Sequence, residues 1–134
     1  MHASKVSISQ EDVKLILDEL ELNRPFEACG VLVGVYEGDV AYVKRTIPIK
    51  NSRRTERSFE LDTVEFYNAW DTAEKENMDV IGVYHTHPES SAIPSDWDRK
   101  FMKNSPPILL IAGINGLFAY ELIDRVIREI DILR

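Results

Sequence analysis

Runs of apolar and β-branched residues constrain the fold of this 134-residue chain more than any other feature. The segment ACGVLVGVY at 28–36 is apolar enough to lie at the centre of a sheet, and the turn EGD joins it to VAYVKRTIPI at 40–49 as a β-hairpin. The segment DVIGVYHTH at 79–87 has the same character until it becomes polar at its histidines. Further strands are expected at 5–8, at 106–114, at 117–123 and, as a last strand or frayed end, at 126–133. Together these segments predict a sheet at the centre of the fold.

Two long helices interrupt the strands. The first, near 10–23, is predicted from Ser9, whose spacing to Asp12 resembles a capping box, and it ends before Pro25. The second is predicted over 62–77 from the same type of spacing at its start. Its apolar side chains, which are expected to face the core, are Val64, Phe66, Tyr67, Trp70 and Ala73. Strands mixed with two long helices and a short third one predict a single α/β domain, a layered α-β-α sandwich around a mixed β-sheet.

Charge and composition exclude a nucleic-acid binder and a membrane-spanning protein. The formal net charge is -7, and no cluster of basic residues is larger than Arg53, Arg54 and Arg57. No apolar run approaches the ~20 residues that span a bilayer, and the start MHASKVSISQEDV has no apolar segment of the kind a secretory signal needs. We therefore expect a cytoplasmic protein.

The chain has a single cysteine, Cys29, so neither an internal disulfide nor a cysteine-based zinc site can form within it. Cys29 is expected to be a small buried residue and not a nucleophile, because no histidine remains to activate it. The third histidine, His2, lies at the N-terminus and is expected to take no part in a site. A metal ion would have to be held by histidine and carboxylate.

The stretch YHTHPESSAIPSDWD at 84–98 contains the candidate metal ligands. His85 and His87 are two residues apart at the end of a strand, so both imidazoles should project to the same side. Asp98 could fold back as a third, oxygen ligand, which would leave one position of a tetrahedral site open for water, as in catalytic zinc sites. Taken alone, the two histidines are a weak signal, and Ser95 with Asp98 is equally well explained as the N-cap of a short helix at 95–103.

The complete string is more specific than its parts. Two histidines one residue apart, seven residues, then Ser95, two residues and Asp98 match the HxH(x7)SxxD signature, and Glu27 precedes the small-residue strand ACGVLVG. In these features the chain resembles the JAMM family of metalloproteases, also called MPN+ domains, in its minimal archaeal and bacterial form. The resemblance covers nearly the whole of residues 1–134 and implies a single catalytic domain with the MPN/JAMM fold, whose layered sheet is related to that of cytidine deaminases.

The resemblance also implies a role for each motif residue. His85, His87 and Asp98 look like the ligands of one catalytic zinc ion. Glu27 looks like the general base that takes a proton from the attacking water and passes it to the leaving amine, and Ser95 looks like a hydrogen-bond donor to the oxyanion. A zinc deaminase is excluded, because its HxE and PCxxC ligand motifs are absent from the sequence.

Members of the family cleave amide or isopeptide bonds after the Gly-Gly tail of ubiquitin or ubiquitin-like proteins, so the resemblance implies such a modifier as the partner. The alternatives are release of a small amino-acid adduct, such as cysteine, from a ubiquitin-like sulfur carrier, and a non-catalytic MPN interaction scaffold. The loop at 51–62, with Arg53, Arg54 and Arg57, is a candidate for contacting an acidic ubiquitin-like surface. The apolar segment at 126–133 could pair as an edge strand in a homodimer.

Overall fold

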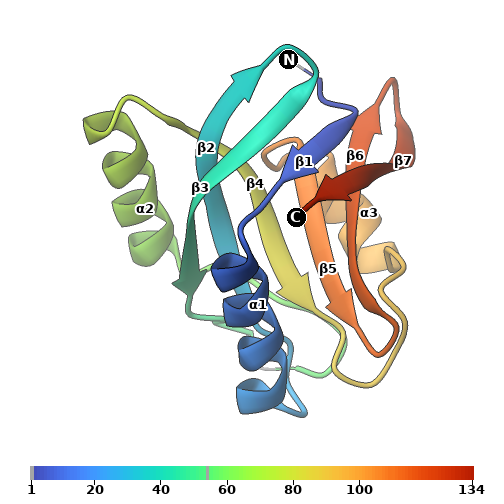
Figure 1. Ribbon diagram of the computed structural model, residues 1–134. Helices are drawn as coiled ribbons and strands as arrows, with labels where there is room; N and C mark the ends of the chain where they lie inside the picture. Colours follow the sequence, from blue (N-terminus) through green and yellow to red (C-terminus); the bar gives the residue numbers. More distant parts are fainter. Residues whose placement is uncertain (1, 54) are drawn as a thin grey trace.

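The computed structural model describes residues 2–53 and 55–134 and shows a curved sheet with helices on both sides (Figure 1). Met1 and Arg54, one of the three arginines of the basic loop, lie outside the described residues. The helices are α1 (Gln10–Asn23), α2 (Thr63–Lys75) and α3 (Asp96–Met102). The strands are β1 (Lys5–Ser7), β2 (Cys29–Glu37), β3 (Val40–Ile49), β4 (Asp79–Thr86), β5 (Ile108–Gly113), β6 (Gly116–Ile123) and β7 (Val126–Leu133).

The sheet is mixed, as predicted, and its two ends are joined. The strands follow the order β1-β3-β2-β4-β5-β6-β7, with β4 and β5 parallel and β2 antiparallel to both of its neighbours. The short β1 pairs in parallel with β3 on one side and with β7 on the other, which closes the sheet. This closure was not predicted, because β1 is only three residues long and its two partners lie far apart in the sequence.

The helices cover opposite faces of the sheet, which confirms the layered α/β architecture. On one face, the helix α1 packs through Val13, Ile16 and Leu20 into a buried cluster with side chains from β2, β4 and β5. On the other face, α2 and α3 pack with the alternate side chains of the same strands. No helix in the described part of the chain is long and apolar enough to cross a membrane.

The second helix is confirmed, but the side of it that faces the core was predicted incorrectly in part. Ala69 and Ala73 are buried against the sheet, and Phe66 packs beside them. Alanines four residues apart lie on one face of the helix, and their small side chains let the helix axis approach the sheet closely. That face of α2 therefore packs on the sheet. The apolar side chains that lie on the solvent side are Val64, Tyr67 and Trp70.

The edge predicted for pairing between two copies is partly occupied. β7 pairs with β6 along one side, and β1 covers the last three residues of its other side, Asp131 to Leu133. Before α2, the segment at 59–62 makes only a single bridge, between Asn51 and Leu61. The homodimer therefore stays a prediction, with a shorter free edge than the sequence indicates.

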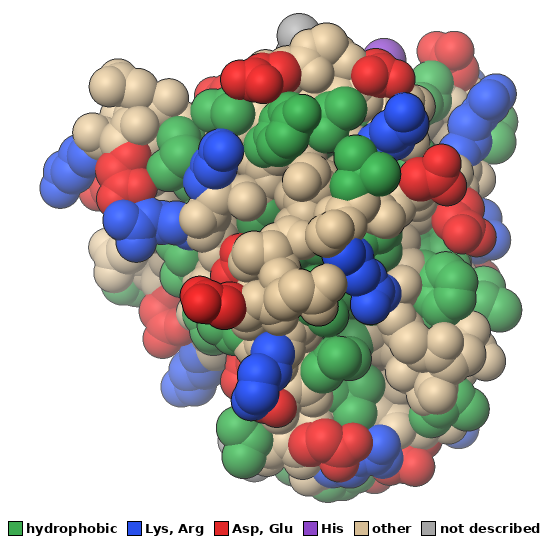
Figure 2. Space-filling view, viewed as in Figure 1, with side chains coloured by type: hydrophobic (Ala, Val, Ile, Leu, Met, Phe, Trp, Pro, Cys, Tyr) green, Lys and Arg blue, Asp and Glu red, His purple; other side chains and the backbone are tan. Residues whose placement is uncertain are grey.

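On the face shown in Figure 2, basic and acidic side chains are interspersed.

The close approach of β2 and β3 at Gly34 gives a test of this fold. A Cβ atom at Gly34 would overlap the backbone oxygen of Tyr42 on the neighbouring strand, where the register shifts. Because that oxygen cannot move without disturbing the strand pairing, Gly34→Ala should lower the free energy of unfolding by about 1–3 kcal/mol. Urea unfolding measures the change.

The matched control is Gly38→Asn in the β2–β3 turn. Gly38 has a φ of 62° and nothing near the position of a Cβ atom, and asparagine tolerates this backbone conformation. Its cost should be below about 1 kcal/mol. Equal unfolding midpoints for Gly34→Ala and the unaltered protein would contradict the close approach.

Candidate metal centre and active site

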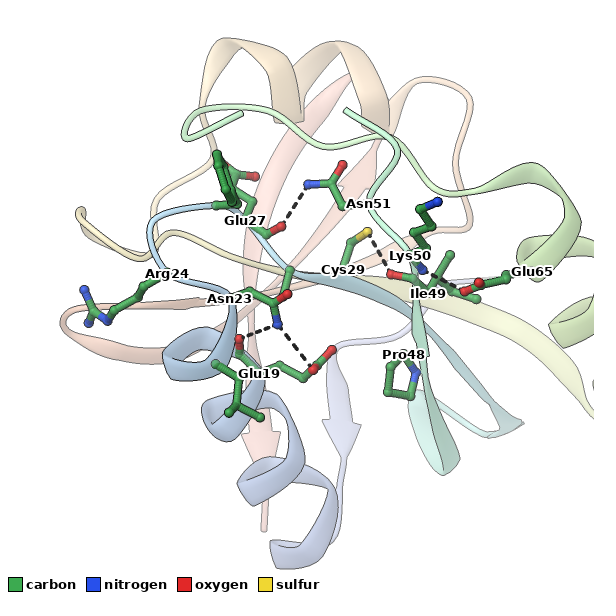
Figure 3. A pocket seen from close by; sticks show the side chains of 13 residues that line it. Glu19, Asn23, Arg24, Glu27, Cys29, Pro48, Ile49, Lys50, Asn51 and Glu65 are labelled. Atoms are coloured by element: carbon green, nitrogen blue, oxygen red, sulfur yellow. Dashed lines mark hydrogen bonds between the residues drawn. The ribbon is translucent and has the colours of Figure 1, made fainter. Parts of the chain in front are cut away.

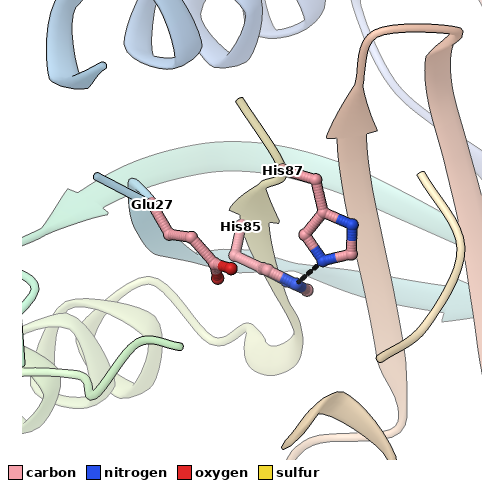
Figure 4. A group of neighbouring side chains, drawn as sticks. All are labelled: Glu27, His85 and His87. Atoms are coloured by element: carbon pink, nitrogen blue, oxygen red, sulfur yellow. Dashed lines mark hydrogen bonds between the residues drawn. The ribbon is translucent and has the colours of Figure 1, made fainter. Parts of the chain in front are cut away.

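The pairing of β2 with β4 brings the predicted site residues together. Cys29 at the start of β2 lies opposite His85 near the end of β4, so Glu27, two residues before Cys29, reaches the same end of the sheet. His87 follows β4 directly, and α3 carries Asp98 to the same place. Figure 4 shows Glu27 beside the two imidazoles. All of these residues are buried.

The three predicted metal ligands are in mutual contact. The Nε2 atoms of His85 and His87 lie 3.1 Å apart. One oxygen of Asp98 lies 2.8 Å from His85 Nε2, and the other lies 3.1 Å from His87 Nε2. The same Asp98 oxygen that faces His87 also accepts a hydrogen bond from Ser95 N–H at 2.9 Å. Two nitrogens and a carboxylate therefore converge on one point.

The hydrogen bonds of His87 fix which of its nitrogens can act as a ligand. Nδ1 lies 2.9 Å from the carbonyl oxygen of Ser91, which can only accept, so Nδ1 carries a proton. In the neutral ring the lone pair is then on Nε2, which points toward Asp98 and His85. A backbone carbonyl behind the ring is the usual support for a metal-binding imidazole.

The electrostatic environment favours the forms that bind metal at two of the three positions. Burial lowers the pKa of His85 despite the nearby carboxylate of Asp98, so this ring is neutral. Burial acts to raise the pKa of Asp98, but the two imidazoles and the Ser95 N–H outweigh it and hold that pKa below its ordinary value. For His87, burial acts to lower the pKa, and Asp98 and the Ser91 carbonyl overcome it, so the pKa is raised and a proton competes with a metal.

The buried ligand atoms fit a metal ion. Oε1 of Glu27 is buried without a hydrogen-bond partner within the described residues, and Nε2 of His85, Nε2 of His87 and the carboxylate of Asp98 face one another at 2.8–3.1 Å. A buried polar atom without a partner costs about 1–3 kcal/mol, and a cation among lone pairs removes that cost. Glu27, His85 and His87 also offer ligand atoms within 4.8 Å of one another, so two carboxylates, of Glu27 and Asp98, compete for the third position. Imidazole and carboxylate together suit zinc and several other divalent ions.

Glu27 is set apart from Asp98 by its surroundings. Its side chain has no hydrogen-bond partner for Oε1, and burial raises its pKa to about 8, with His87 opposing and Asp98 adding to the rise. The peptide group between Glu27 and Ala28 is held at its carbonyl and at its N–H. The Asn51 side chain donates to the carbonyl of Glu27 at 2.8 Å, and Thr86 Oγ1 accepts from the N–H of Ala28 at 2.9 Å. A fixed, poorly solvated carboxylate with a pKa near neutral suits proton transfer.

Ser95 caps α3, which confirms the capping interpretation of its spacing to Asp98. Ser95 Oγ accepts from the N–H of Asp98 at 3.1 Å, and the Asp98 carboxylate accepts from the N–H of Ser95. Because the hydroxyl oxygen acts as acceptor in the cap, its own hydrogen stays free to donate. Ser95 lines a hollow of about 370 Å³ together with Glu27 and His87, so that hydrogen can point to a group bound there.

A second, larger hollow also has Glu27 in its wall. It has a volume of about 550 Å³ and lies between the C-terminal end of α1 and β3, with Asn51 on its wall (Figure 3). Cys29 also lines it but is buried, and burial raises the pKa of its thiol to about 12, which agrees with the prediction of an inert cysteine. Glu27 therefore lines both hollows.

Several supporting contacts have no signal in the motif. The ring of Phe59 stacks on His85 with centroids 4.5 Å apart, and the indole of Trp97 donates to the carbonyl of Phe59 at 3.0 Å. Asn51, Thr86 and Ser91 support Glu27 and His87 from sequence positions that the pattern does not include. These contacts form only when the fold brings their segments beside the site, so the motif does not predict them. His2 lies away from these residues, where it contacts Glu121 at 2.7 Å.

Known proteins resemble this chain over most of its length. Residues 9–123 match the family described as prokaryotic homologues of the JAB domain. The chain is 34% identical over 113 residues to a desampylase from Pyrococcus furiosus, covering 84% of this chain and 77% of the relative. It is 33% identical over 110 residues to a desampylase from Haloferax volcanii, covering 81% and 78%. A CysO-cysteine peptidase from Mycobacterium tuberculosis is 28% identical over 112 residues, covering 80% and 75%.

Solved structures share the fold. A protein from Desulfitobacterium hafniense superimposes with a TM-score of 0.84 at 24% identity, covering 96% of this chain and 91% of that one. A JAB1/MPN domain protein from Archaeoglobus fulgidus gives a TM-score of 0.58 at 20% identity, covering 98% of both chains. These likenesses agree with the layered mixed sheet predicted from the sequence.

The donor set predicts one divalent cation per chain, which titration with Zn²⁺ in a calorimeter tests. His85→Ala and His87→Ala should each lower the affinity roughly 100-fold or more, because losing a ligand exceeds the 10–100-fold cost of losing a supporting contact. Affinity should fall at acidic pH, since protons compete for the imidazoles. His2→Ala is the matched control and should bind Zn²⁺ like the unaltered chain. An equal loss in all three variants would contradict the site.

Proposed function

Because this chain belongs to the family of prokaryotic homologues of the JAB domain, we propose that it is a zinc-dependent hydrolase acting on ubiquitin-like modifier proteins. It cleaves the amide bond that follows the modifier's C-terminal Gly-Gly tail. The observation that carries this proposal is the convergence of His85, His87 and Asp98 on one point, with the buried carboxylate of Glu27 beside them.

The residues that would hold the metal are His85, His87 and Asp98. Asp98 is favoured over Glu27 as the third ligand because its oxygens lie within 3.1 Å of both Nε2 atoms and the cap of α3 fixes its orientation. Zinc bound by two imidazoles and one carboxylate polarises a carbonyl group and lowers the pKa of water to near ~7. All three ligands are buried, so bulk water has little access to compete for them.

Glu27 moves the proton. Its carboxylate accepts a proton from the attacking water and passes it to the leaving amine, which needs a pKa close to the working pH. Burial raises the pKa of Glu27 toward that range, and the hydrogen bonds of Asn51 to the Glu27 carbonyl and of Thr86 to the N–H of Ala28 hold the backbone that carries it. The same group therefore acts first as base and then as acid.

Ser95 stabilises the oxyanion. Its oxygen accepts from the N–H of Asp98, so its hydrogen is free to donate to a group in the hollow that it shares with Glu27 and His87. Donors of this type contribute about 10²–10³-fold to the rate of other hydrolases. The cap holds Ser95 in position before substrate binds, which is what makes such a donor effective.

Two leaving groups are open to this chemistry. The desampylases to which the chain is similar favour removal of a modifier from another protein. The chain is also similar to a CysO-cysteine peptidase, and Arg57 lines the hollow that contains Glu27, His87 and Ser95. Both observations favour release of a single amino acid from a ubiquitin-like carrier. The scaffold alternative is disfavoured, because every catalytic position of the pattern is occupied and the residues are in contact.

Glu27→Gln tests the proposal. The variant keeps the size of the side chain but cannot accept a proton, so kcat/KM on an isopeptide-linked ubiquitin-like conjugate should fall by about 10²–10⁴-fold. Zn²⁺ affinity, measured by calorimetry, should change little because Glu27 is not a ligand.

Glu37→Gln, at the exposed far end of β2, is the control and should cleave like the unaltered chain. Cleavage by Glu27→Gln at the unaltered rate would remove Glu27 from the mechanism. Loss of Zn²⁺ from that variant would instead make Glu27 a ligand.

A further inference from the structure

The hollow of about 370 Å³ beside the predicted metal ligands, called here the catalytic hollow, has a cationic side chain that the proposed mechanism does not use. Beside Glu27, His87 and Ser95, its wall includes Arg57 from the loop that precedes α2. Among the described residues, Arg57 is the only lysine or arginine that lines this hollow. A guanidinium in the wall of this hollow is a candidate for binding part of the substrate.

Arg57 has no partner within the described residues, unlike Arg24 and Arg53. Arg24 is bound by Glu21 and Glu89, and Arg53 lies 4.2 Å above the ring of Trp97. No ion pair, hydrogen bond or ring contact engages Arg57 in the described structure. Glu89, which shares the wall of the hollow, is already held by Arg24 at 3.0 Å. Glu56 also lines the hollow, but no ion pair joins it to Arg57 among the described residues, and both side chains are exposed. The guanidinium is therefore free to bind an anion.

The two possible leaving groups differ in the anion that they carry. A single amino acid joined through its α-amine has a carboxylate on the carbon next to the scissile nitrogen. A lysine joined through its ε-amine has four methylene groups there and no charge. Guanidinium and carboxylate form paired, charge-assisted hydrogen bonds, which discriminate strongly between these groups. No aromatic or branched aliphatic side chain among the described residues lines the hollow to cover a lysine stem.

We propose that Arg57 binds the α-carboxylate of the leaving group, so that the preferred substrate is a ubiquitin-like protein whose C-terminal glycine is joined to the α-amine of a single amino acid. This inference rests on the proposed function and adds the leaving group to it. Water adds to the glycine carbonyl, the C–N bond breaks, and the products are the glycine carboxylate and a free amino acid whose amine takes up a proton. No oxidant or reductant takes part.

The test compares three substrates made from one ubiquitin-like protein that ends in Gly-Gly. The first is extended by alanine with a free carboxylate, the second by alaninamide, and the third is joined to the ε-amine of a lysine in a peptide. The unaltered enzyme should cleave the alanine substrate about 10–100-fold faster than the alaninamide substrate, because one charge-assisted contact is lost. Arg57→Gln should reduce this ratio to near one, and Arg57→Lys should retain part of it.

Arg53→Gln is the matched control, since it removes the same charge from the same loop outside the hollow, and it should keep the ratio. Equal rates on alanine and alaninamide, or an unchanged ratio in Arg57→Gln, would overturn the inference. Cleavage of the lysine conjugate alone would also overturn it while supporting the proposed function. Cleavage of none of the three would count against the proposed function itself, and the inference would fall with it.

Discussion

The rest of this structure depends on one constraint, the contact of two imidazoles, His85 and His87, with the carboxylate of Asp98 at the end of β4. His85 and Asp98 are almost completely buried, with exposed fractions of 0% and 1%. Buried charges and unpaired lone pairs are costly unless opposite charge lies beside them. The fold accepts this cost at the site, and the residues around it hold the ligand atoms together. A cation at that point turns the cost into binding energy.

The scaffold uses the same atoms for structure and for the site. The Asp98 carboxylate that faces the imidazoles also completes the cap of α3, so the position of the helix and the position of the ligand are one and the same. Strand pairing between β2 and β4 sets the distance from His85 to the segment that holds Glu27. Thr86 bonds that segment from within β4. A change in strand register would therefore move the ligands and the base relative to each other, which explains why they are held by buried hydrogen bonds.

Features that depend on residues close together in the sequence could be predicted, whereas features that depend on contacts between distant segments could not. The first helix and the β2–β3 hairpin match their predictions, because caps and turns are short-range signals. His85 and His87 share a face because alternation along a strand is equally local. Glu27 could be assigned only through resemblance to a family, since its proximity to the histidines comes from pairing of two strands that are distant in the chain. Closure of the sheet by β1, the solvent side of α2 and the contacts of Asn51 are long-range in the same sense.

The most direct measurement of the central claim is anomalous X-ray diffraction at the zinc absorption edge from crystals of the Zn²⁺-loaded protein. The account predicts one anomalous peak per chain, bonded to Nε2 of His85, Nε2 of His87 and one oxygen of Asp98, with Glu27 outside bonding distance. A peak bonded to Glu27 in place of Asp98 would make Glu27 a ligand and remove the proposed base. Absence of a peak between the two imidazoles would contradict the metal centre and the hydrolase built on it.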